Sequence, residues 1–263
     1  FDNYLTDPVL GTRESIAKFS REEISRFHSE FCNKKDAIVS VCSNLSKSKM
    51  KDLLVKYFGK QTGKISQANK HTDSLYRDAR VLESERGGVE HTYVWMGMPG
   101  FNTPSDNIYA TQIMTTILGR GMDSRLFTEV REKRGLVYGV SSSYNDWQHG
   151  SVSMVDFSTR HCNVEDALDI VEVELDKMKN TLITEEELQR AKNKMRSSFY
   201  SAIEDSYSIA YWGIKEKLFK TPSIESYISK MDEVTREDVK CVARTVLDES
   251  KRLTLVCRGV SGE

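Results

Sequence analysis

Apolar and polar positions along the chain follow two different periods, which together predict a mixture of helices and strands. Apolar residues spaced three or four apart indicate amphipathic helices, and strict alternation indicates strands with one buried face. The helical period appears at residues 20–31, 45–58, 107–118, 164–181 and 184–203. Strand-like runs appear at residues 37–42, 90–97, 136–140, 141–144, 150–158 and 253–257.

Two of these helices begin with a recognisable capping sequence. Ser20 is followed three residues later by Glu23, and Thr184 is followed by Glu187 at the same spacing. In such a capping box the hydroxyl and the carboxylate each accept a hydrogen bond from the other residue's backbone amide. Helix starts are therefore predicted at both places.

The end of the chain repeats its beginning. Moving residues 16–42 forward by 215 positions aligns Ile16 with Met231, Ser20 with Thr235 and Val41 with Val256, together with apolar positions between them. Two amphipathic helices and a strand therefore recur in the same register, which indicates an internal repeat. The second copy runs from about residue 81 to the end, whereas only about 60 residues belong to the first copy. We therefore expect most of a first, homologous domain to lie upstream of Phe1.

A polar segment divides the two copies. Residues 61–80 are rich in Lys, Gln, Ser and Asn and contain hardly any apolar residue, which is typical of a linker. The predicted organisation is a C-terminal tail of one domain at residues 1–60, the linker at 61–80, and one complete domain at 81–263. The predicted fold is α+β, with an antiparallel or mixed sheet packed by helices on one face.

Composition excludes several classes of protein. The 38 basic and 39 acidic residues leave a net charge of −1, so the basic excess of a nucleic-acid-binding protein is missing. No apolar run approaches the roughly 20 residues that cross a bilayer, so no membrane association is expected. The five cysteines are odd in number and never spaced C-x-x-C. They predict buried free thiols in a reducing compartment, such as cytoplasm or mitochondrial matrix.

The stretch from residue 117 to 140 contains the candidate site. Gly119 and Gly121 are predicted to bracket a turn whose backbone conformation disfavours other residues. Asp123 or Ser124 is expected to cap the helix that follows.

That helix should end at Gly135, a position suited to a C-cap glycine, before the strand at 136–140. Arg131 then lies in the last turns of the helix and Tyr138 just beyond it, so their long side chains could converge on one point. A simpler interpretation pairs Arg131 with a helix neighbour and packs Tyr138 in the core.

The same stretch carries a family resemblance. LGRGMDSRLFTEVREKRGLVYGV resembles the most characteristic segment in the C-terminal domain of the pitrilysin/insulinase family, the inverted zincins that include the mitochondrial processing peptidase and bacterial two-domain zinc proteases. WMGMPGFNTPSDNIYATQIMTTILG before it and TLITEEELQRAKNKMRSSF after it agree with the family too. Arg120 and Asp123 stand where the family has glycine and serine.

The resemblance implies a metallopeptidase-type domain and a role for particular residues. In this family, an H-x-x-E-H helix of the N-terminal domain holds a zinc ion, and an Arg and a Tyr seven residues apart reach across from the C-terminal domain. Arg131 and Tyr138 match that pair as auxiliary, substrate-positioning residues, and Gly119 and Gly121 match the substrate-binding loop.

No zinc site is expected in this chain itself. A zincin helix needs two histidines and a carboxylate at fixed spacing, and none of the five histidines occurs in such a pair. These are His28, His71, His91, His149 and His161. We find no dinucleotide-binding or phosphate-binding glycine motif and no nucleophile in a recognisable context. The chain alone is therefore predicted to be inactive and free of cofactors, with zinc in the missing N-terminal half.

Three hypotheses on function follow. The first is the C-terminal part of a zinc-dependent endopeptidase, forming the substrate-binding wall of the peptide chamber. Its partners would be a peptide substrate and the N-terminal zinc-bearing domain or subunit. The second is a catalytically silent family member that acts as a scaffold or peptide-binding subunit, as core subunits of some respiratory complexes do. The third is a free-standing peptide-binding module. Exposed apolar helix faces such as Ile24, Phe27 and Phe31 make a homodimer a further option.

Overall fold

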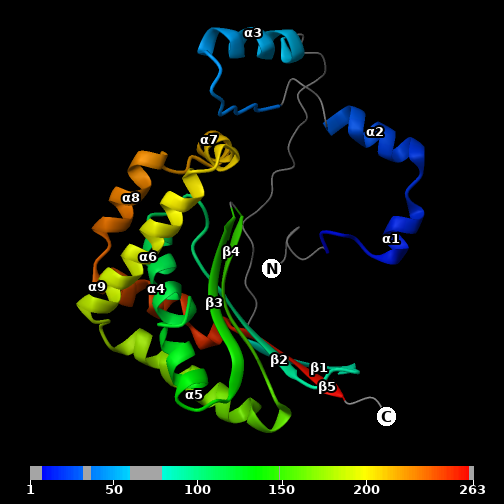
Figure 1. The fold of residues 1–263 in the computed structure, drawn as a ribbon. Coiled ribbons are helices and arrows are strands. Elements are labelled where there is room, and N and C mark those ends of the chain that lie inside the picture. Colours follow the sequence, from blue (N-terminus) through cyan, green and yellow to red (C-terminus); the bar gives the residue numbers. More distant parts are fainter. Residues whose placement is uncertain (1–7, 32–36, 60–78, 148, 261–263) are drawn as a thin grey trace.

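The structure is a computed structural model, which describes residues 8–31, 37–59, 79–147 and 149–260. Its N-terminal part contains the helices α1 (Arg13–Lys18), α2 (Arg21–Phe31) and α3 (Lys47–Phe58). These helices lie apart from a sheet and its covering helices, which the rest of the chain forms (Figure 1). No described residue between positions 8 and 59 is buried. The hydrophobic core of the described residues therefore belongs to the second part.

A five-stranded mixed sheet forms one layer of that second part. Its strands lie in the order β1-β5-β2-β4-β3. The β1–β5 pair is parallel and the other pairs are antiparallel, so the predicted α+β fold with a mixed sheet is confirmed. The runs at 136–140 and 141–144 belong to one continuous strand. The strands are β1 (Arg80–Gly87), β2 (Thr92–Pro99), β3 (Val137–Trp147), β4 (Gly150–Thr159) and β5 (Leu253–Val260).

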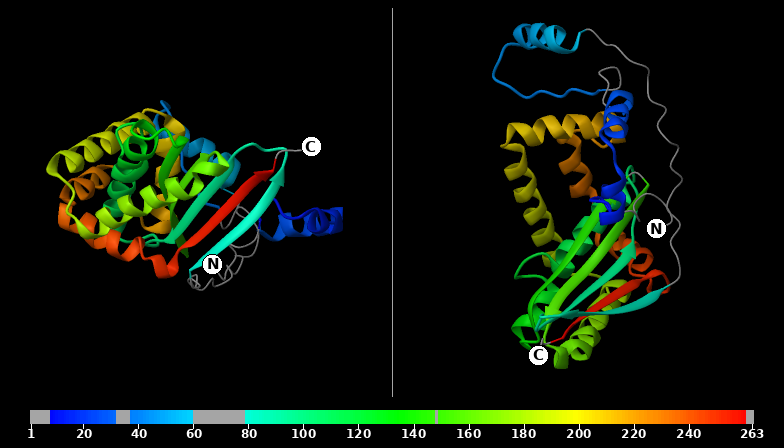
Figure 2. Two further views of the ribbon diagram at one scale, coloured as in Figure 1. Left: turned by 90° about the horizontal axis from the view of Figure 1, so that it is seen from below. Right: turned by 90° about the vertical axis from the view of Figure 1, so that its right-hand side faces the viewer.

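Helices gather on one side of the sheet (Figure 2). The helix α4 is the central one, because it is apolar around most of its circumference and contacts β3, α5, α6 and α9. None of the described helices combines the length and apolar character needed to cross a bilayer. The helices of this layer are α4 (Asn107–Gly119), α5 (Val164–Asn180), α6 (Glu185–Ile203), α7 (Ser206–Phe219), α8 (Ile224–Glu233) and α9 (Arg236–Val246), with short turns η2 (Phe127–Glu132), η3 (His161–Asn163) and η4 (Glu249–Lys251).

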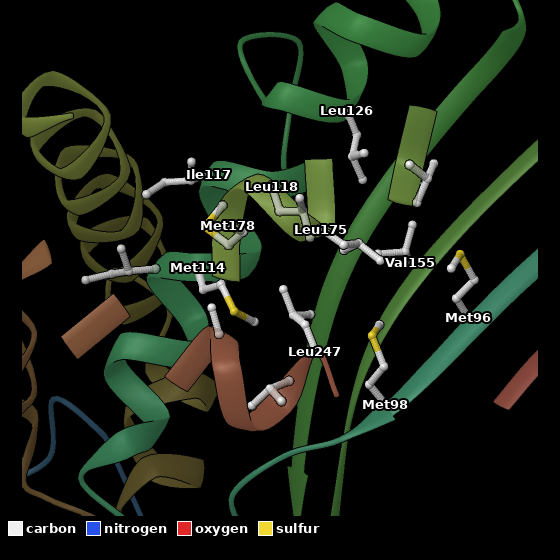
Figure 3. Close-up of a cluster of buried hydrophobic side chains, with 14 of the residues drawn as sticks. Met96, Met98, Met114, Ile117, Leu118, Leu126, Val155, Leu175, Met178 and Leu247 are labelled. Carbon is white, nitrogen blue, oxygen red and sulfur yellow. The ribbon is translucent and has the colours of Figure 1, made fainter. Parts of the chain in front are cut away.

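Alternation along the strands separates the core from an uncovered sheet face. Met96 and Met98 of β2 belong to one cluster of buried side chains with Met114 of α4 and Met178 of α5 (Figure 3). Tyr93 and Trp95, at the alternate positions of β2, lie on the opposite face and are not buried. The helices therefore cover one face of the sheet, as the sequence predicts.

The predicted helix starts are confirmed. In α6, the Thr184 hydroxyl accepts from the Glu187 amide and the Glu187 carboxylate accepts from the Thr184 amide. The same reciprocal bonds join Ser20 and Glu23 at the start of α2. Local hydrogen-bonding chemistry fixes these starts, which explains why the sequence alone locates them.

The predicted strand at residues 37–42 is wrong. This segment forms no strand, and its apolar side chains Ile38, Val39 and Val41 are 38%, 42% and 45% exposed. The matching strand of the repeat, β5, pairs with β1 on one side and β2 on the other. No described strand is placed to pair with residues 37–42 in that way, and a strand needs a partner for its backbone. The predicted linker at 61–80 lies almost entirely outside the described residues.

Candidate functional site

The two residues singled out by the sequence lie in contact with each other. The guanidinium carbon of Arg131 lies 5.1 Å from the centre of the Tyr138 ring and 4.8 Å from the centre of the Phe127 ring. Arg131 is therefore stacked between two aromatic rings, a geometry in which the π-faces attract the cation. The role of Phe127 was not predicted, although its position four residues before Arg131 places both on one side of a helix.

The local backbone explains how Arg131 and Tyr138 meet. Gly135 adopts a left-handed conformation with φ +62° and ends the helical segment, as predicted. The chain then enters β3, where a bulge between Val137 and Gly139 shifts the register against β4. Such a bulge re-aims a side chain at the end of a strand. The Tyr138 ring is consequently presented at the surface, beside Arg131.

Neither residue has the surroundings of a purely structural group. Tyr138 is 80% exposed, so it does not pack in the core. Arg131 forms no ion pair with any carboxylate in the described part of the chain. The guanidinium edge and the phenol hydroxyl are therefore left as hydrogen-bond donors for a ligand.

The helix that carries Arg131 is not the predicted α-helix. Residues Phe127–Glu132 form a π-helix, and the Lys133 amide donates to the Thr128 carbonyl five residues earlier at 3.0 Å. A π-turn contains one more residue than an α-turn and is frequent at functional sites. Leu126 and Val130, four residues apart, are both buried, and this spacing fits either helix type over so short a segment.

The two glycines before this helix act in different ways. Gly121 has φ +98°, a left-handed conformation that favours glycine, as predicted. Gly119 is instead the last residue of α4, and a Cβ there would lie 2.4 Å from the Ser142 backbone nitrogen. Its glycine is required for close packing of α4 against β3, so the expected conformational reason is wrong for Gly119. A substrate-binding role of this loop stays a prediction.

The helical segment begins directly after Ser124, as predicted, and the Ser124 carbonyl accepts from the Thr128 amide at 3.0 Å, but the side chains of Asp123 and Ser124 bind elsewhere. The Asp123 carboxylate binds Lys194 of α6 at 2.8 Å, and this hydrogen bond holds the pKa of the carboxyl group below its ordinary value. The Ser124 hydroxyl donates to the Gly121 carbonyl at 2.6 Å. Lys194 also donates to the carbonyl of Arg120. A tertiary ion pair thus replaces a local cap and joins the turn to α6.

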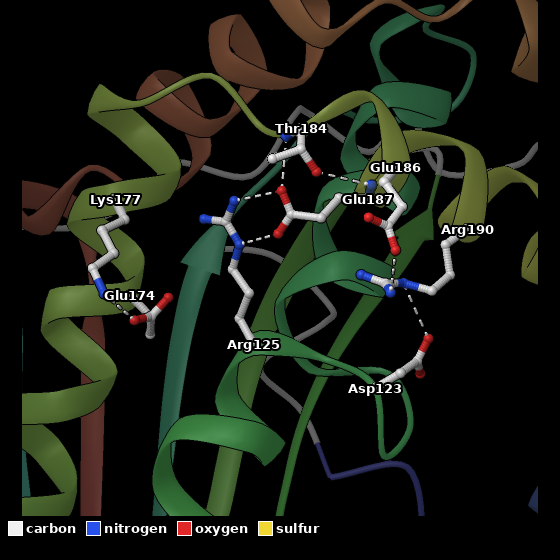
Figure 4. Close-up of polar contacts among 8 residues, drawn as sticks. All are labelled: Asp123, Arg125, Glu174, Lys177, Thr184, Glu186, Glu187 and Arg190. Carbon is white, nitrogen blue, oxygen red and sulfur yellow. Dashed lines mark hydrogen bonds and ion pairs between the residues drawn. The ribbon is translucent and has the colours of Figure 1, made fainter. Parts of the chain in front are cut away.

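A second contact with α6 fixes the start of the Arg131 segment. Arg125 donates two hydrogen bonds to the Glu187 carboxylate, at 2.6 and 2.9 Å (Figure 4). Glu187 simultaneously accepts from the Thr184 amide at 2.8 Å. Burial opposes the charge of Glu187, but the bonds from Arg125 and Thr184 outweigh burial and lower its pKa. We call this pair the Arg125–Glu187 clamp. The sequence predicts the capping box but not the partner 62 residues away.

The described residues do not fit a zinc site. No group of three His, Cys, Asp or Glu side chains that could hold a metal ion occurs in the described part of the chain. The His161 Nδ1 accepts from the Thr92 hydroxyl at 2.5 Å, and its Nε2 donates to the Gly259 carbonyl, so both ring nitrogens are engaged. Cys42, Cys162, Cys241 and Cys257 are free thiols, but the prediction that they are buried is wrong, since Cys162 and Cys241 are exposed and Cys42 and Cys257 are half-buried. A reducing compartment stays a prediction.

Comparison with known proteins gives consistent matches across most of the chain. The family model described as the peptidase M16 inactive domain matches residues 18–195. An uncharacterized zinc protease of Streptomyces coelicolor is 29% identical over 263 residues, which cover 97% of this chain and 57% of that protein. An uncharacterized zinc protease of Rickettsia felis is 30% identical over 209 residues, covering 77% of this chain and 48% of that protein.

Solved structures share the fold. A protease from Helicobacter pylori aligns with a TM-score of 0.86 at 21% identity, covering 95% of this chain and 62% of that chain. A chain of complex III2 from Candida albicans, bound to Inz-5, aligns with a TM-score of 0.80 at 16% identity, covering 97% of this chain and 62% of that chain. The chain therefore spans between 48% and 62% of the length of these relatives.

Proposed function

This chain belongs to the peptidase M16 family and contains that family's inactive domain, and we propose that it is the C-terminal part of a zinc-dependent endopeptidase. In that protein it supplies the substrate-binding wall of the peptide chamber. The zinc ion and its ligands would lie in an N-terminal domain or subunit, since the described residues of this chain do not fit a metal site.

The domain organisation proposed from the sequence accounts for the exposed N-terminal segment. Residues 1–60 would complete the zinc-bearing domain, residues 61–80 would be the linker, and residues 81–263 would form the C-terminal domain. In the second repeat, Val242 and Val256 are 2% and 3% exposed. Their counterparts Phe27 and Val41 are 60% and 45% exposed. The first repeat therefore has the apolar pattern of a core segment without the sheet that would bury it.

The observation that carries the proposal is the contact between the half-buried Arg131 and the exposed Tyr138. Hydrolysis of a peptide bond develops negative charge on the scissile carbonyl oxygen, and the peptide must be held in register. Arg131 would hold backbone carbonyls of the substrate. Tyr138 would donate a hydrogen bond from its hydroxyl to the carbonyl at or beside the scissile bond. Stacking on Phe127 and Tyr138 restricts the guanidinium plane and leaves its N–H edge available.

The rival proposal is a catalytically silent subunit that binds peptides or scaffolds a complex. The fold likeness to a chain of complex III2 supports it, because that chain belongs to a large assembly. The hydrogen-bond donors of Arg131 and Tyr138 favour the protease, since a scaffold has no need of them. The presence of H-x-x-E-H in the upstream domain or partner subunit would favour the protease, and its absence would favour the scaffold.

The experiment measures peptide hydrolysis by the chain alone and by the chain assembled with its zinc-bearing part. We expect activity only in the assembly. Tyr138→Phe should lower kcat on the order of 100-fold, the usual effect of removing one preorganised donor, with an unchanged Tm. Tyr207→Phe is the matched control, because Tyr207 is 74% exposed on α7, outside the pair. Normal kcat/KM in Tyr138→Phe would contradict the proposal.

A further inference from the structure

A groove of about 490 Å³ lies on the helix-covered side of the sheet, away from Arg131 and Tyr138. It is formed by α4, β3, α6, α7 and α8. A smaller cavity of about 120 Å³ adjoins it, and the two share Gln112, Trp212 and Tyr227. We call the groove and the cavity together the α4 groove. Nothing in the proposed role of Arg131 and Tyr138 uses it.

One wall of the α4 groove is aromatic. The ring of Phe199 stacks on Tyr227 at 4.8 Å between centroids, and Trp212 meets both rings edge-on at 5.3 and 5.2 Å. The Trp212 indole N–H donates to the Pro222 carbonyl, which fixes the orientation of the ring. A rigid aromatic surface of this kind suits a ligand with apolar or planar groups.

The charged side chains of the α4 groove leave a positive excess. Arg120 lines the groove, and Lys215 and Lys220 line the cavity. None of the three forms an ion pair with a carboxylate among the described residues. The two carboxylates that line the cavity are already engaged: Asp106 pairs with Lys230, and Asp146 accepts from the Thr103 hydroxyl.

Uncharged hydrogen-bond donors also line the α4 groove. The Gln112 side-chain oxygen accepts from the Tyr227 hydroxyl at 2.8 Å, which leaves its amide N–H groups for a ligand. Burial raises the pKa of Tyr227 to about 12, so this hydroxyl remains protonated. The Thr221 hydroxyl is buried at the cavity and has no hydrogen-bond partner in the described part of the chain. A buried hydroxyl without a hydrogen-bond partner lowers the stability of the fold, and a ligand that accepts a hydrogen bond from it would remove that cost.

The backbone at the cavity supplies a further observation. Lys220 ends α7 with φ +54°, and it is the non-glycine residue with positive φ in the described part of the chain. Glycine takes this conformation without strain, whereas a side chain is disfavoured there. A lysine therefore occupies a position where glycine would be more stable. Strain of this kind is typical of functional positions.

We propose that the α4 groove binds an acidic peptide segment through its carboxylates. The cations lie in two places, Arg120 in the groove and Lys215 with Lys220 in the cavity, and the aromatic residues shared by both lie between them. A small anion can contact only one of these places, whereas an extended peptide can place a carboxylate at each and an apolar side chain on the aromatic wall. Arg120 stands where the resembled family has glycine, so the preference for an acidic peptide is specific to this chain.

The test measures binding of a labelled peptide of alternating glutamate and tyrosine, with blocked ends, by fluorescence anisotropy. The same peptide with glutamine in place of glutamate is the ligand control, and inorganic phosphate is the competitor. The protein variants are Arg120→Gln, Lys215→Gln and Lys220→Gly, singly and combined. Lys217→Gln is the matched control, because it removes an exposed charge of α7 that does not line the groove.

Each single variant is expected to weaken binding a few-fold and the triple variant about tenfold or more, as for exposed ion pairs. The Tm of Arg120→Gln and of Lys215→Gln should not change. Lys220→Gly should lose affinity while its Tm rises, which separates binding from folding. Added salt should weaken binding by the parental chain. Equal affinity for the glutamine peptide, or parental affinity in the triple variant, would overturn the proposal. If phosphate at the same concentration as the peptide displaces the peptide, the α4 groove is a small-anion site. That result would also overturn the proposal.

Discussion

Replacing Glu187 by glutamine would remove the charge of the Arg125–Glu187 clamp and leave its shape. Glutamine keeps a side-chain oxygen that can accept from the Thr184 amide, so the capping box survives the change. What disappears is the charge of the pair and one of the two hydrogen bonds from Arg125, because the glutamine NH2 group that replaces one carboxylate oxygen cannot accept. The substitution therefore isolates the contact that joins the start of the Arg131 segment to α6.

The burial of the pair sets the size of the effect. The side chains of Arg125 and Glu187 are 18% and 15% exposed, between a surface pair and a buried one. Surface pairs contribute ~0–1 kcal/mol, and breaking a fully buried pair costs ~3–5 kcal/mol because the remaining charge is left uncompensated. We therefore expect Glu187→Gln to lower the free energy of unfolding by about 2 kcal/mol at neutral pH.

The pH dependence has a definite sign. The pKa of Glu187 in the folded chain lies below its ordinary value of 4.5, so the carboxylate stabilises the fold fully above that value. This stabilisation is lost as the pH falls through the lowered pKa of the folded state. The difference in unfolding free energy between the parental chain and Glu187→Gln should therefore be largest at neutral pH and shrink below about pH 4.5.

Urea denaturation of both chains across this pH range measures the difference directly. Glu186→Gln is the matched control, because the neighbouring Glu186 is 84% exposed and its contact with Arg190 at 3.4 Å should contribute little. Equal destabilisation by the two substitutions, or a difference that does not change with pH, would refute the idea that charge holds the clamp together.

Three further substitutions test the packing. Gly119→Ala should cost about 1–3 kcal/mol in thermal or urea unfolding because its Cβ would strike the β3 backbone, whereas Gly139→Ala meets no atom within 4 Å and should cost much less. Lys192→Met should lower the free energy of unfolding by about 2 kcal/mol, because the buried ammonium group donates at 2.8 and 2.6 Å to two carbonyls at the end of α8. Equal stability of the two chains would mean that water donates to these carbonyls in place of the ammonium group. Val256→Ala should cost about 2 kcal/mol in the chain alone, while Val41→Ala at the matching repeat position should cost almost nothing until the proposed zinc-bearing domain binds. Equal losses for the two valines in the chain alone would contradict the proposed domain organisation.

Local signals explain the parts of the fold that the sequence predicts correctly. The capping boxes at Ser20 and Thr184 involve residues three apart, so they mark the starts of α2 and α6 without knowledge of the fold. The alternation along β2 and the helical period of α4 arise from burial on known faces. The register of the repeat correctly places β5 after α9.

The incorrect predictions depend on contacts between distant residues. Asp123 has the chemistry of an N-cap, but Lys194, 71 residues away, binds its carboxylate instead. The strand at residues 37–42 has the right alternation and lacks a neighbouring strand among the described residues. The π-turn at Arg131 adds one residue to a segment that is fixed at both ends. The segment has six residues, which are too few for the spacing of apolar positions to distinguish a π-helix from an α-helix.

Different contacts hold the backbone of the Arg131 segment and the side chains of Arg131 and Tyr138. Its backbone is fixed by the clamp at Glu187 and by the left-handed turn at Gly135. Arg131 and Tyr138, by contrast, contact each other and Phe127 through their ring faces, and these contacts leave their hydrogen-bond donors free. A binding residue must be held in place without losing the groups that bind, and stacking achieves this because it restricts a guanidinium without occupying its N–H groups. A purely structural arginine would direct the same N–H groups at a carboxylate, as Arg125 does. Arg125 and Arg131 thus have opposite environments, and this contrast supports a ligand-binding role for Arg131.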